Sequence, residues 1–152
     1  MKRYTFRKLS VTALTLAALL MLASCGEKAK TAADNVAEGD RLLAASEDPG
    51  SAQKAVQCYS RALAQEPGNP RAVYGRGMAR ARGRDFKGAL EDFNQAVQRD
   101  PKNAEAYYRR AMCRIVATGD KVAAAKDLET CLALNPQHQG AARMLNVLRH
   151  GG

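Results

Sequence analysis

The sequence contains no tryptophan, only two histidines, three phenylalanines and five tyrosines. It has no Cys-x-x-Cys pair, so His138 and His150 lack the cysteine partners typical of a structural zinc site. It also has no Ser-His-Asp spacing and no glycine-rich loop suited to cradle a phosphate. The acidic pairs at residues 47–48 and 91–92 are expected on a loop and on a solvated helix face. The sequence therefore predicts no enzymatic activity, no cofactor and no metal site.

A stripe of alternating aromatic and basic residues is also missing, although basic residues are abundant. Lysine and arginine number 24 against 15 acidic residues, giving a formal charge of +9, and arginine is concentrated between Arg71 and Arg84. Proteins that hold single-stranded nucleic acid place aromatic rings among their positive charges. We therefore expect no nucleic acid partner, and the surplus arginine better suits anionic lipid headgroups or an acidic protein.

The most informative feature that is present is a repeated template. Residues 55–67, 89–101 and 124–136 each place apolar side chains at positions i, i+1, i+4, i+7 and i+8, and a proline at i+12. The first two segments start 34 residues apart and the last two start 35 residues apart. A period in this range is typical of stacked helix-turn-helix units. Such arrays usually bind other molecules.

Local signals divide each unit into two short antiparallel helices. Proline after the apolar stripe ends one helix, and Asn69-Pro70 or Asn103-Ala104 begins the next. Within units, Gly83 and Gly119 end the first helix, and the aspartates that follow cap the second. The first unit has a longer internal loop at residues 47–50. The expected helices cover residues 32–46, 51–65, 70–82, 86–99, 104–117, 121–134 and 138–149.

With these elements in place, the chain resembles the tetratricopeptide repeat proteins. The second unit carries the resemblance most closely, through Tyr74, Gly77, Gly83, Asp85, Phe86, Ala89, Phe93, Ala96 and Pro101. The third matches through Tyr107, Tyr108, Ala111, Gly119, Asp120, Ala124, Leu128 and Pro136. The resemblance implies an all-α, right-handed α-solenoid over residues 32–149. Its three units would cover residues 32–67, 68–101 and 102–136, and residues 138–149 would form a C-terminal capping helix.

The resemblance also implies a concave groove lined by the first helix of each unit. The groove residues for a bound peptide would be Arg71, Tyr74, Met78, Glu105, Tyr108, Arg109 and Met112. The alternative is that Met78 and Met112 are ordinary core residues between helices. Members that clamp a C-terminal carboxylate use lysine and asparagine at set positions. Here Val36, Asp40, Gly75 and Glu105 occupy those positions and only Arg109 fits, so we do not expect capture of such a tail.

Arginine and aspartate recur where the two helices of a unit face each other. Arg80 and Asp92 occupy the same repeat positions as Arg114 and Asp127. We expect an ion pair inside each repeat, Arg80 with Asp92 and Arg114 with Asp127. The alternative is that these arginines contact a ligand.

The N-terminus has the pattern of an export signal. Four basic residues, Lys2, Arg3, Arg7 and Lys8, precede a 14-residue apolar stretch over residues 9–22, which is short for a membrane span. Residues 22–25, Leu-Ala-Ser-Cys, resemble the lipobox of bacterial lipoproteins, with Cys25 as the lipidated residue. The resemblance implies a signal peptide at 1–24, a polar tether at 25–31, and a mature charge of +5. The alternatives are an ordinary signal peptide or a weak membrane helix.

Three cysteines remain after Cys25, so they cannot all pair among themselves. Cys131 occupies a position that alanine fills in the other units, which favours a small buried hydrophobe. A Cys113–Cys131 disulfide is the alternative in an oxidising compartment.

The resulting hypothesis is a lipid-anchored adaptor that binds an envelope protein or peptide. It would lie at the outer membrane if the source has two membranes, and otherwise on the outer face of the cell membrane. The alternative is a cell-surface docking protein that binds peptidoglycan or polysaccharide.

Overall fold

The computed structural model describes residues 30–45 and 48–150, and within these ranges the chain is all-α, with seven helices and no strand. The helices are α2 (Ala32–Ala45), α3 (Pro49–Gln65), α4 (Pro70–Arg82), α5 (Phe86–Arg99), α6 (Ala104–Thr118), α7 (Lys121–Leu134) and α8 (Gln139–His150). None of these helices is long and apolar enough to cross a membrane. Cys25 and the apolar segment before it lie outside the described residues.

Most of the helices begin in the same way. The side chain of the residue before the helix accepts a hydrogen bond from the backbone N–H three residues later. Asn69 accepts from the N–H of Ala72 at 3.0 Å, and Asn103 accepts from the N–H of Ala106 at 3.0 Å. Asp48, Asp85 and Asp120 cap α3, α5 and α7 in the same way. Each cap satisfies a donor that the helix leaves unpaired, so these residues set the chain's helix boundaries.

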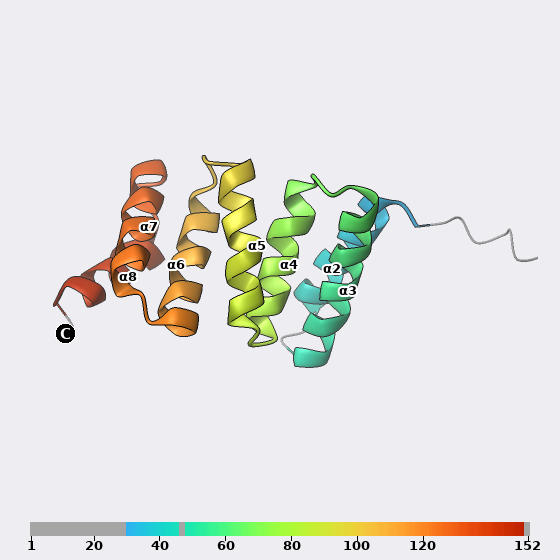
Figure 1. Ribbon diagram of the computed structural model, residues 1–152, viewed down its shortest axis with the longest axis horizontal. Helices are drawn as coiled ribbons and strands as arrows, with labels where there is room; N and C mark the ends of the chain where they lie inside the picture. Colours follow the sequence, from blue (N-terminus) through green and yellow to red (C-terminus); the bar gives the residue numbers. More distant parts are fainter. Residues whose placement is uncertain (1–29, 46–47, 151–152) are drawn as a thin grey trace, which may run out of the picture. The chain divides into compact units, whose positions relative to one another are not determined.

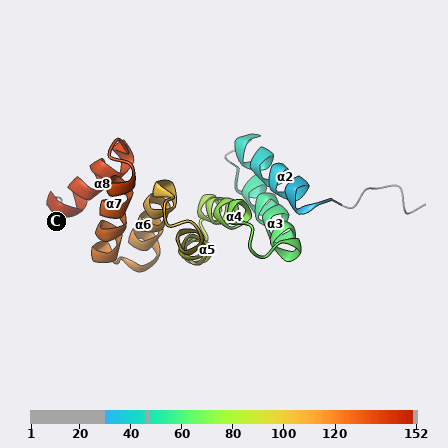
Figure 2. The same cartoon turned by 90° about the horizontal axis from the view of Figure 1, so that it is seen from above.

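The helices pack in consecutive pairs, α2 with α3, α4 with α5 and α6 with α7, and α8 lies against α7. They follow one another side by side in chain order (Figure 1), and α2, α4 and α6 occupy one side of the row (Figure 2). Contacts join α2 to α4 and α4 to α6. The first helices of the three units therefore form one surface.

The repeated apolar template forms the contacts between these helices. Its small-residue position is filled by Ala62, Ala96 and Cys131, and all three are buried. Its aromatic or leucine position is filled by Tyr59, Phe93 and Leu128, which are fully buried. Burial of these stripes is the main favourable contribution to such a stack.

Glycines admit a large ring between the first two units. A Cβ at Gly39 would lie 2.7 Å from the Tyr59 ring, and a Cβ at Gly75 would lie 2.5 Å from it. Tyr59 thus fills the space that side chains on α2 and α4 would otherwise occupy.

Two local expectations need correction: the start of α3, and Asp92, which is fully buried instead of lying on a solvated helix face. Gly83 ends α4 as expected, but the turn that follows has an unusual conformation. Residues 49 and 50 belong to α3, because Asp48 caps that helix and Pro49 is tolerated in its first turn, so the internal loop of the first unit is shorter than expected. In the turn between α4 and α5, Gly83 has a φ of −74°, and Arg84 takes the left-handed conformation with a φ of 64°. The corresponding left-handed residue after α6 is Gly119, at 69°.

Candidate functional site

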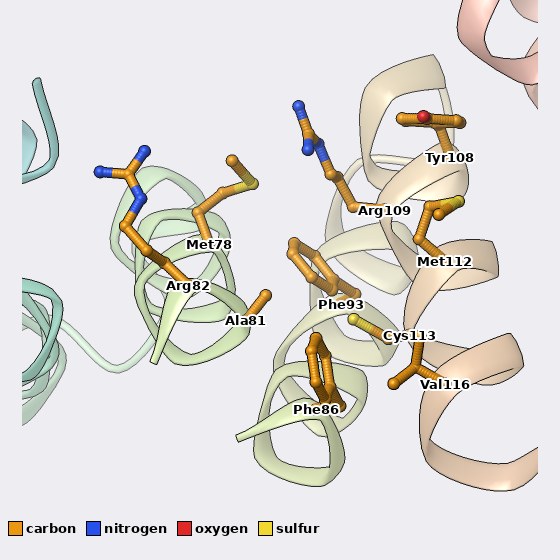
Figure 3. Close-up of a pocket in the computed structure, with 10 residues that line it drawn as sticks. All are labelled: Met78, Ala81, Arg82, Phe86, Phe93, Tyr108, Arg109, Met112, Cys113 and Val116. Carbon is orange, nitrogen blue, oxygen red and sulfur yellow. The ribbon is translucent and has the colours of Figure 1, made fainter. Parts of the chain in front are cut away.

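An apolar pocket opens between α4 and α6, with α5 as its floor (Figure 3). It encloses about 360 Å³ and is lined by Met78, Ala81, Arg82, Phe86, Phe93, Tyr108, Arg109, Met112, Cys113 and Val116. The phenylalanines come from α5, and the other lining residues come from the two neighbouring first helices. Met78 and Met112 lie on opposite sides of the pocket, on α4 and α6 (Figure 3).

A second depression continues this surface toward α2. It is lined by Asp40, Leu43, Ala44, Tyr59, Arg71, Tyr74, Gly75, Met78 and Arg82. Because Met78 and Arg82 line both depressions, the two lie next to each other on the surface of α2, α4 and α6, and we call them together the groove. The structure thus brings together all the groove residues named from the sequence except Glu105, which lines neither depression.

Charged groups at the α2 end of the groove are paired with each other. Asp40 accepts a hydrogen bond from the Tyr59 hydroxyl at 2.7 Å and from Arg71 Nη2 at 2.6 Å. Burial, together with the hydrogen bond to Asp40, raises the pKa of Tyr59, so its hydroxyl stays protonated and donates. This end of the groove is polar but internally compensated.

The two groove tyrosines also support the fold. Tyr74 packs edge-on against Phe93, with ring centroids 5.8 Å apart, and Tyr108 lies 4.6 Å from the ring of His138. Burial raises the pKa of Tyr74, an effect that Glu105 reinforces. Both rings are half-buried, so they form walls of the groove instead of projecting freely from it.

Glu105 lies outside the groove lining and contacts two residues near α8, Arg109 and His138. It accepts a hydrogen bond from Arg109 Nε at 2.6 Å, and its other oxygen lies 2.9 Å from His138 Nε2. Partial burial opposes ionisation, but the hydrogen bond with His138 and the charge of Arg109 lower the pKa of Glu105 below its usual value. His138 Nδ1 accepts from the N–H of Ala141 at 3.0 Å, which caps α8. This network fixes the orientation of Arg109 at the pocket.

The structure separates the two possibilities for the methionines. Met78 packs against the buried cluster of Ala89, Phe93 and Cys113, so part of its role is in the core. Met112 belongs to none of the buried clusters formed by the described residues, but it does line the pocket. Its position therefore favours the groove over the core.

Arginine and aspartate form a buried network away from the pocket. Arg80 Nη1 lies 3.0 Å from Asp92 Oδ2, and Arg114 Nη1 lies 2.9 Å from Asp127 Oδ2. Each carboxylate also binds a second arginine that the sequence reasoning missed, at 2.6 Å: Arg76 for Asp92 and Arg110 for Asp127. These side chains join the two helices of a unit, so their role is structural.

Cysteine serves packing in the described part of the chain. Cys58, Cys113 and Cys131 are buried free thiols there, and no disulfide joins Cys113 to Cys131. Burial raises the pKa of Cys113 to about 11, so the thiol lining the pocket is neutral. The pocket therefore offers an apolar, uncharged sulfur instead of a reactive thiolate.

Sequence reasoning named Met78, Tyr108, Arg109 and Met112 as groove residues, but it did not place Arg82, Cys113, Val116 or the two phenylalanines of the floor there. Phe86 and Phe93 were recognisable only as repeat positions, and Arg82 was part of an undivided basic stretch. His138 gave a usable signal, because it stands directly before α8 as Asn69 and Asn103 stand before α4 and α6.

Comparison with known proteins agrees with this architecture. A sequence model of the tetratricopeptide repeat family matches residues 48–104 and 79–139. A comparison with the curated protein sequences gives no significant match.

Solved structures of similar fold include peptide complexes. The first tetratricopeptide repeat domain of Spaghetti (RPAP3), bound to the HSP90 peptide SRMEEVD, is 27% identical with a TM-score of 0.72, over 79% of this chain and 91% of that chain. The second such domain of human RPAP3, in complex with the HSP70 peptide SGPTIEEVD, is 26% identical with a TM-score of 0.70, over 78% and 94%. The Arabidopsis OM64 domain is 26% identical with a TM-score of 0.71, over 78% and 93%.

Proposed function

Because the chain belongs to the tetratricopeptide repeat family, a family of protein-interaction scaffolds, we propose that it is an adaptor that binds a segment of a partner protein in the groove across α2, α4 and α6. The observation that carries this proposal is the adjacency of the two depressions, which share Met78 and Arg82 and together extend over the three first helices. A groove of this length suits a chain segment better than a compact small molecule.

The chemistry of the groove favours a peptide over a sugar. Its centre is lined by methionine, phenylalanine and valine, and its tyrosine rings are packed against neighbours. A saccharide site would instead offer exposed planar rings within a polar cleft. The solved relatives bound to HSP90 and HSP70 peptides support the same class of partner.

The location is the second part of the proposal. We propose that residues 1–24 are a lipoprotein signal peptide and that Cys25 carries the lipid that holds the domain at a bacterial envelope membrane. The support is the order of basic, apolar and small residues before Cys25. Two or three acyl chains would give stable anchoring where one would not.

Cys25→Ala tests the anchor. The variant should accumulate as an uncut precursor, because the thiol that would be acylated is absent. It should also be found in a different cell fraction from the mature protein. Immunoblots of fractionated cells and mass spectrometry of the N-terminus measure both effects. Normal maturation and fractionation of the variant would refute the lipoprotein assignment.

Photo-cross-linking in cells tests the adaptor. A photoreactive residue replacing Tyr108 in the groove should yield a defined protein adduct, and one replacing Val122, which is 83% exposed on α7, is the matched control. Adducts from position 122 with none from position 108 would move the binding surface away from the groove.

A further inference from the structure

A histidine caps α8 at the position where asparagine caps α4 and α6. His138 stands directly before α8, as Asn69 stands before α4 and Asn103 before α6. We propose that this histidine makes the C-terminal helix pH-sensitive, because protonation of His138 removes the cap of α8 and weakens the packing of that helix on α7. The device lies in the fold itself and does not depend on a partner in the groove.

The contacts of the imidazole define its protonation state. Nδ1 of His138 lies 3.0 Å from the backbone nitrogen of Ala141, which is a donor, so Nδ1 carries a lone pair. Nε2 lies 2.9 Å from a carboxylate oxygen of Glu105, which is an acceptor, so Nε2 carries the hydrogen. The His138 side chain is only 14% exposed. Only the neutral ring with its hydrogen on Nε2 makes both bonds, so the cap of α8 requires that form.

The two asparagine caps make the same bond without this requirement. Asn69 and Asn103 each use an amide oxygen, 3.0 Å from the backbone nitrogen three residues later. An amide oxygen does not titrate, whereas an unperturbed imidazole changes its charge between about pH 5 and pH 8. Among these three caps, only the one at α8 can therefore be removed by a proton.

The groups that face His138 hold the protonated ring in place without restoring the cap. Partial burial opposes ionisation of Glu105, but the hydrogen bond with His138 and the charge of Arg109 lower the pKa of this carboxyl, so it is ionised and attracts an imidazolium. Arg109, bound to that carboxylate, and the N-terminal end of α8 repel one. The ring of Tyr108 lies 4.6 Å away, and on α7 burial and the charge of Glu105 raise the pKa of Cys131, so this thiol is neutral. Because Glu105 still binds Nε2, the new hydrogen on Nδ1 points at a backbone N–H, and two donors face each other.

The affected turn carries much of the packing of α8. Only two residues of this helix, Ala141 and Leu145, are buried, and they belong to one cluster with Leu128 and Cys131 of α7. Ala141 is also the residue whose N–H the cap binds. Helices at the end of a chain open with the least free energy, so loss of the cap acts where the fold resists opening least.

Hydrogen exchange of the backbone amides, followed by NMR on the purified protein, tests the device. Protection factors, which correct for the intrinsic pH dependence of exchange, are compared at about pH 7.5 and about pH 5. In the wild type, protection of the α8 amides should fall about fivefold relative to the α7 amides on acidification, as expected for a lost cap. Equal protection of α8 at the two pH values would overturn the proposal.

Two substitutions provide a matched pair, because the chain has only two histidines and both flank α8. His138→Asn installs the cap found at α4 and α6, so the protection of α8 should no longer depend on pH. His150 is the exposed last residue of α8, where a positive charge is favourable, so His150→Asn should behave as the wild type does. A loss of protection in His138→Asn as large as that in the wild type would exclude His138 as the switch.

A second measurement needs no variant. Nitrogen NMR of the His138 ring at neutral pH should show a lone-pair nitrogen at Nδ1 and a protonated one at Nε2. The amide proton of Ala141 should then shift with the same pH midpoint as the ring, because the bond between them is lost. A hydrogen on Nδ1 at neutral pH, or an Ala141 amide that does not follow the ring, would overturn the proposal.

Discussion

Replacing Asp92 by asparagine should destabilise the domain far more than replacing Glu129 by glutamine. Asp92 is fully buried and binds Arg76 at 2.6 Å and Arg80 at 3.0 Å. Glu129 binds Arg149 at 2.7 Å, but about half of each of these side chains is exposed. Each substitution removes one carboxylate charge, but Asp92 is buried and binds two arginines, whereas Glu129 is exposed and binds one.

The structure sets the expected magnitude. Removing one partner of a buried ion pair typically costs about 3–5 kcal/mol, because the remaining charge is uncompensated. Here Arg76 and Arg80 retain 18% and 24% side-chain exposure, and Arg80 also donates to the carbonyl of Gly88 at 3.0 Å. We therefore expect a loss of about 2–3 kcal/mol. An exposed pair such as Arg149–Glu129 is worth about 0–1 kcal/mol.

Urea denaturation followed by circular dichroism measures this difference. With an m-value of about 2 kcal/mol/M, Asp92→Asn should lower the midpoint by about 1 M or more, and Glu129→Gln by less than half of that. Adding Arg76→Met to Asp92→Asn should recover part of the loss, since one uncompensated charge is removed. Equal midpoints for the two single variants would refute the reasoning from burial.

Three further predictions concern strain, packing and pH. Arg84→Gly should stabilise the domain by about 0.5–1 kcal/mol in thermal denaturation, because a left-handed φ of 64° costs a side-chain residue more than it costs glycine; a destabilised variant would contradict this. Gly75→Ala should cost about 1–3 kcal/mol, and less in a Tyr59→Leu background, because the new Cβ would lie 2.5 Å from the ring; equal costs in both backgrounds would exclude the clash. The pKa of Glu105 is lowered in the folded state, so its stabilising contribution is present above its usual value of 4.5 and lost as pH falls through the folded pKa. Glu105→Gln should flatten the pH dependence of unfolding below 4.5, and an unchanged acid limb would refute the assignment.

Helix positions were predictable because their signals are local. Asn69 and Asn103 each cap the helix that directly follows them, and the apolar stripes alone predict the buried faces. Most predicted helix ends agree with the structure to within one residue, and α3 is the exception at Pro49. Proline reads as a loop residue in sequence, although the first turn of a helix accommodates it.

The second arginine of each ion network could not be derived in the same way. Arg76 and Arg110 lie one helical turn before the arginines that were predicted, and only the packed geometry shows that both reach one carboxylate. The left-handed turn at Arg84 was also missed, because the neighbouring Gly83 is the usual choice for that conformation. In the networks both arginines reach the carboxylate, and in the turn Arg84 takes the left-handed conformation in place of Gly83. The sequence named one candidate in each case, and the folded geometry added the other.

The groove was the least predictable part, and a comparison of the second and third units explains why. Positions that pack between helices keep their chemistry over a step of 34 residues, as in Ala72 and Ala106, Arg76 and Arg110, and Arg80 and Arg114. Groove positions are mixed: Tyr74 and Tyr108, like Met78 and Met112, keep their chemistry over the same step, whereas Gly75 and Arg109, like Arg82 and Val116, change it.

This difference follows from what each position contacts. A residue between helices meets the same neighbours in every unit, so its size and charge are fixed by the stack. An exposed groove residue such as Val116 is packed less closely by its own chain, so folding constrains its chemistry less. Arg82 and Val116 now place a charge and an apolar surface on opposite walls of one pocket. The two walls therefore differ at this position, although each wall also carries an arginine and a methionine, Arg82 and Met78 on α4 and Arg109 and Met112 on α6.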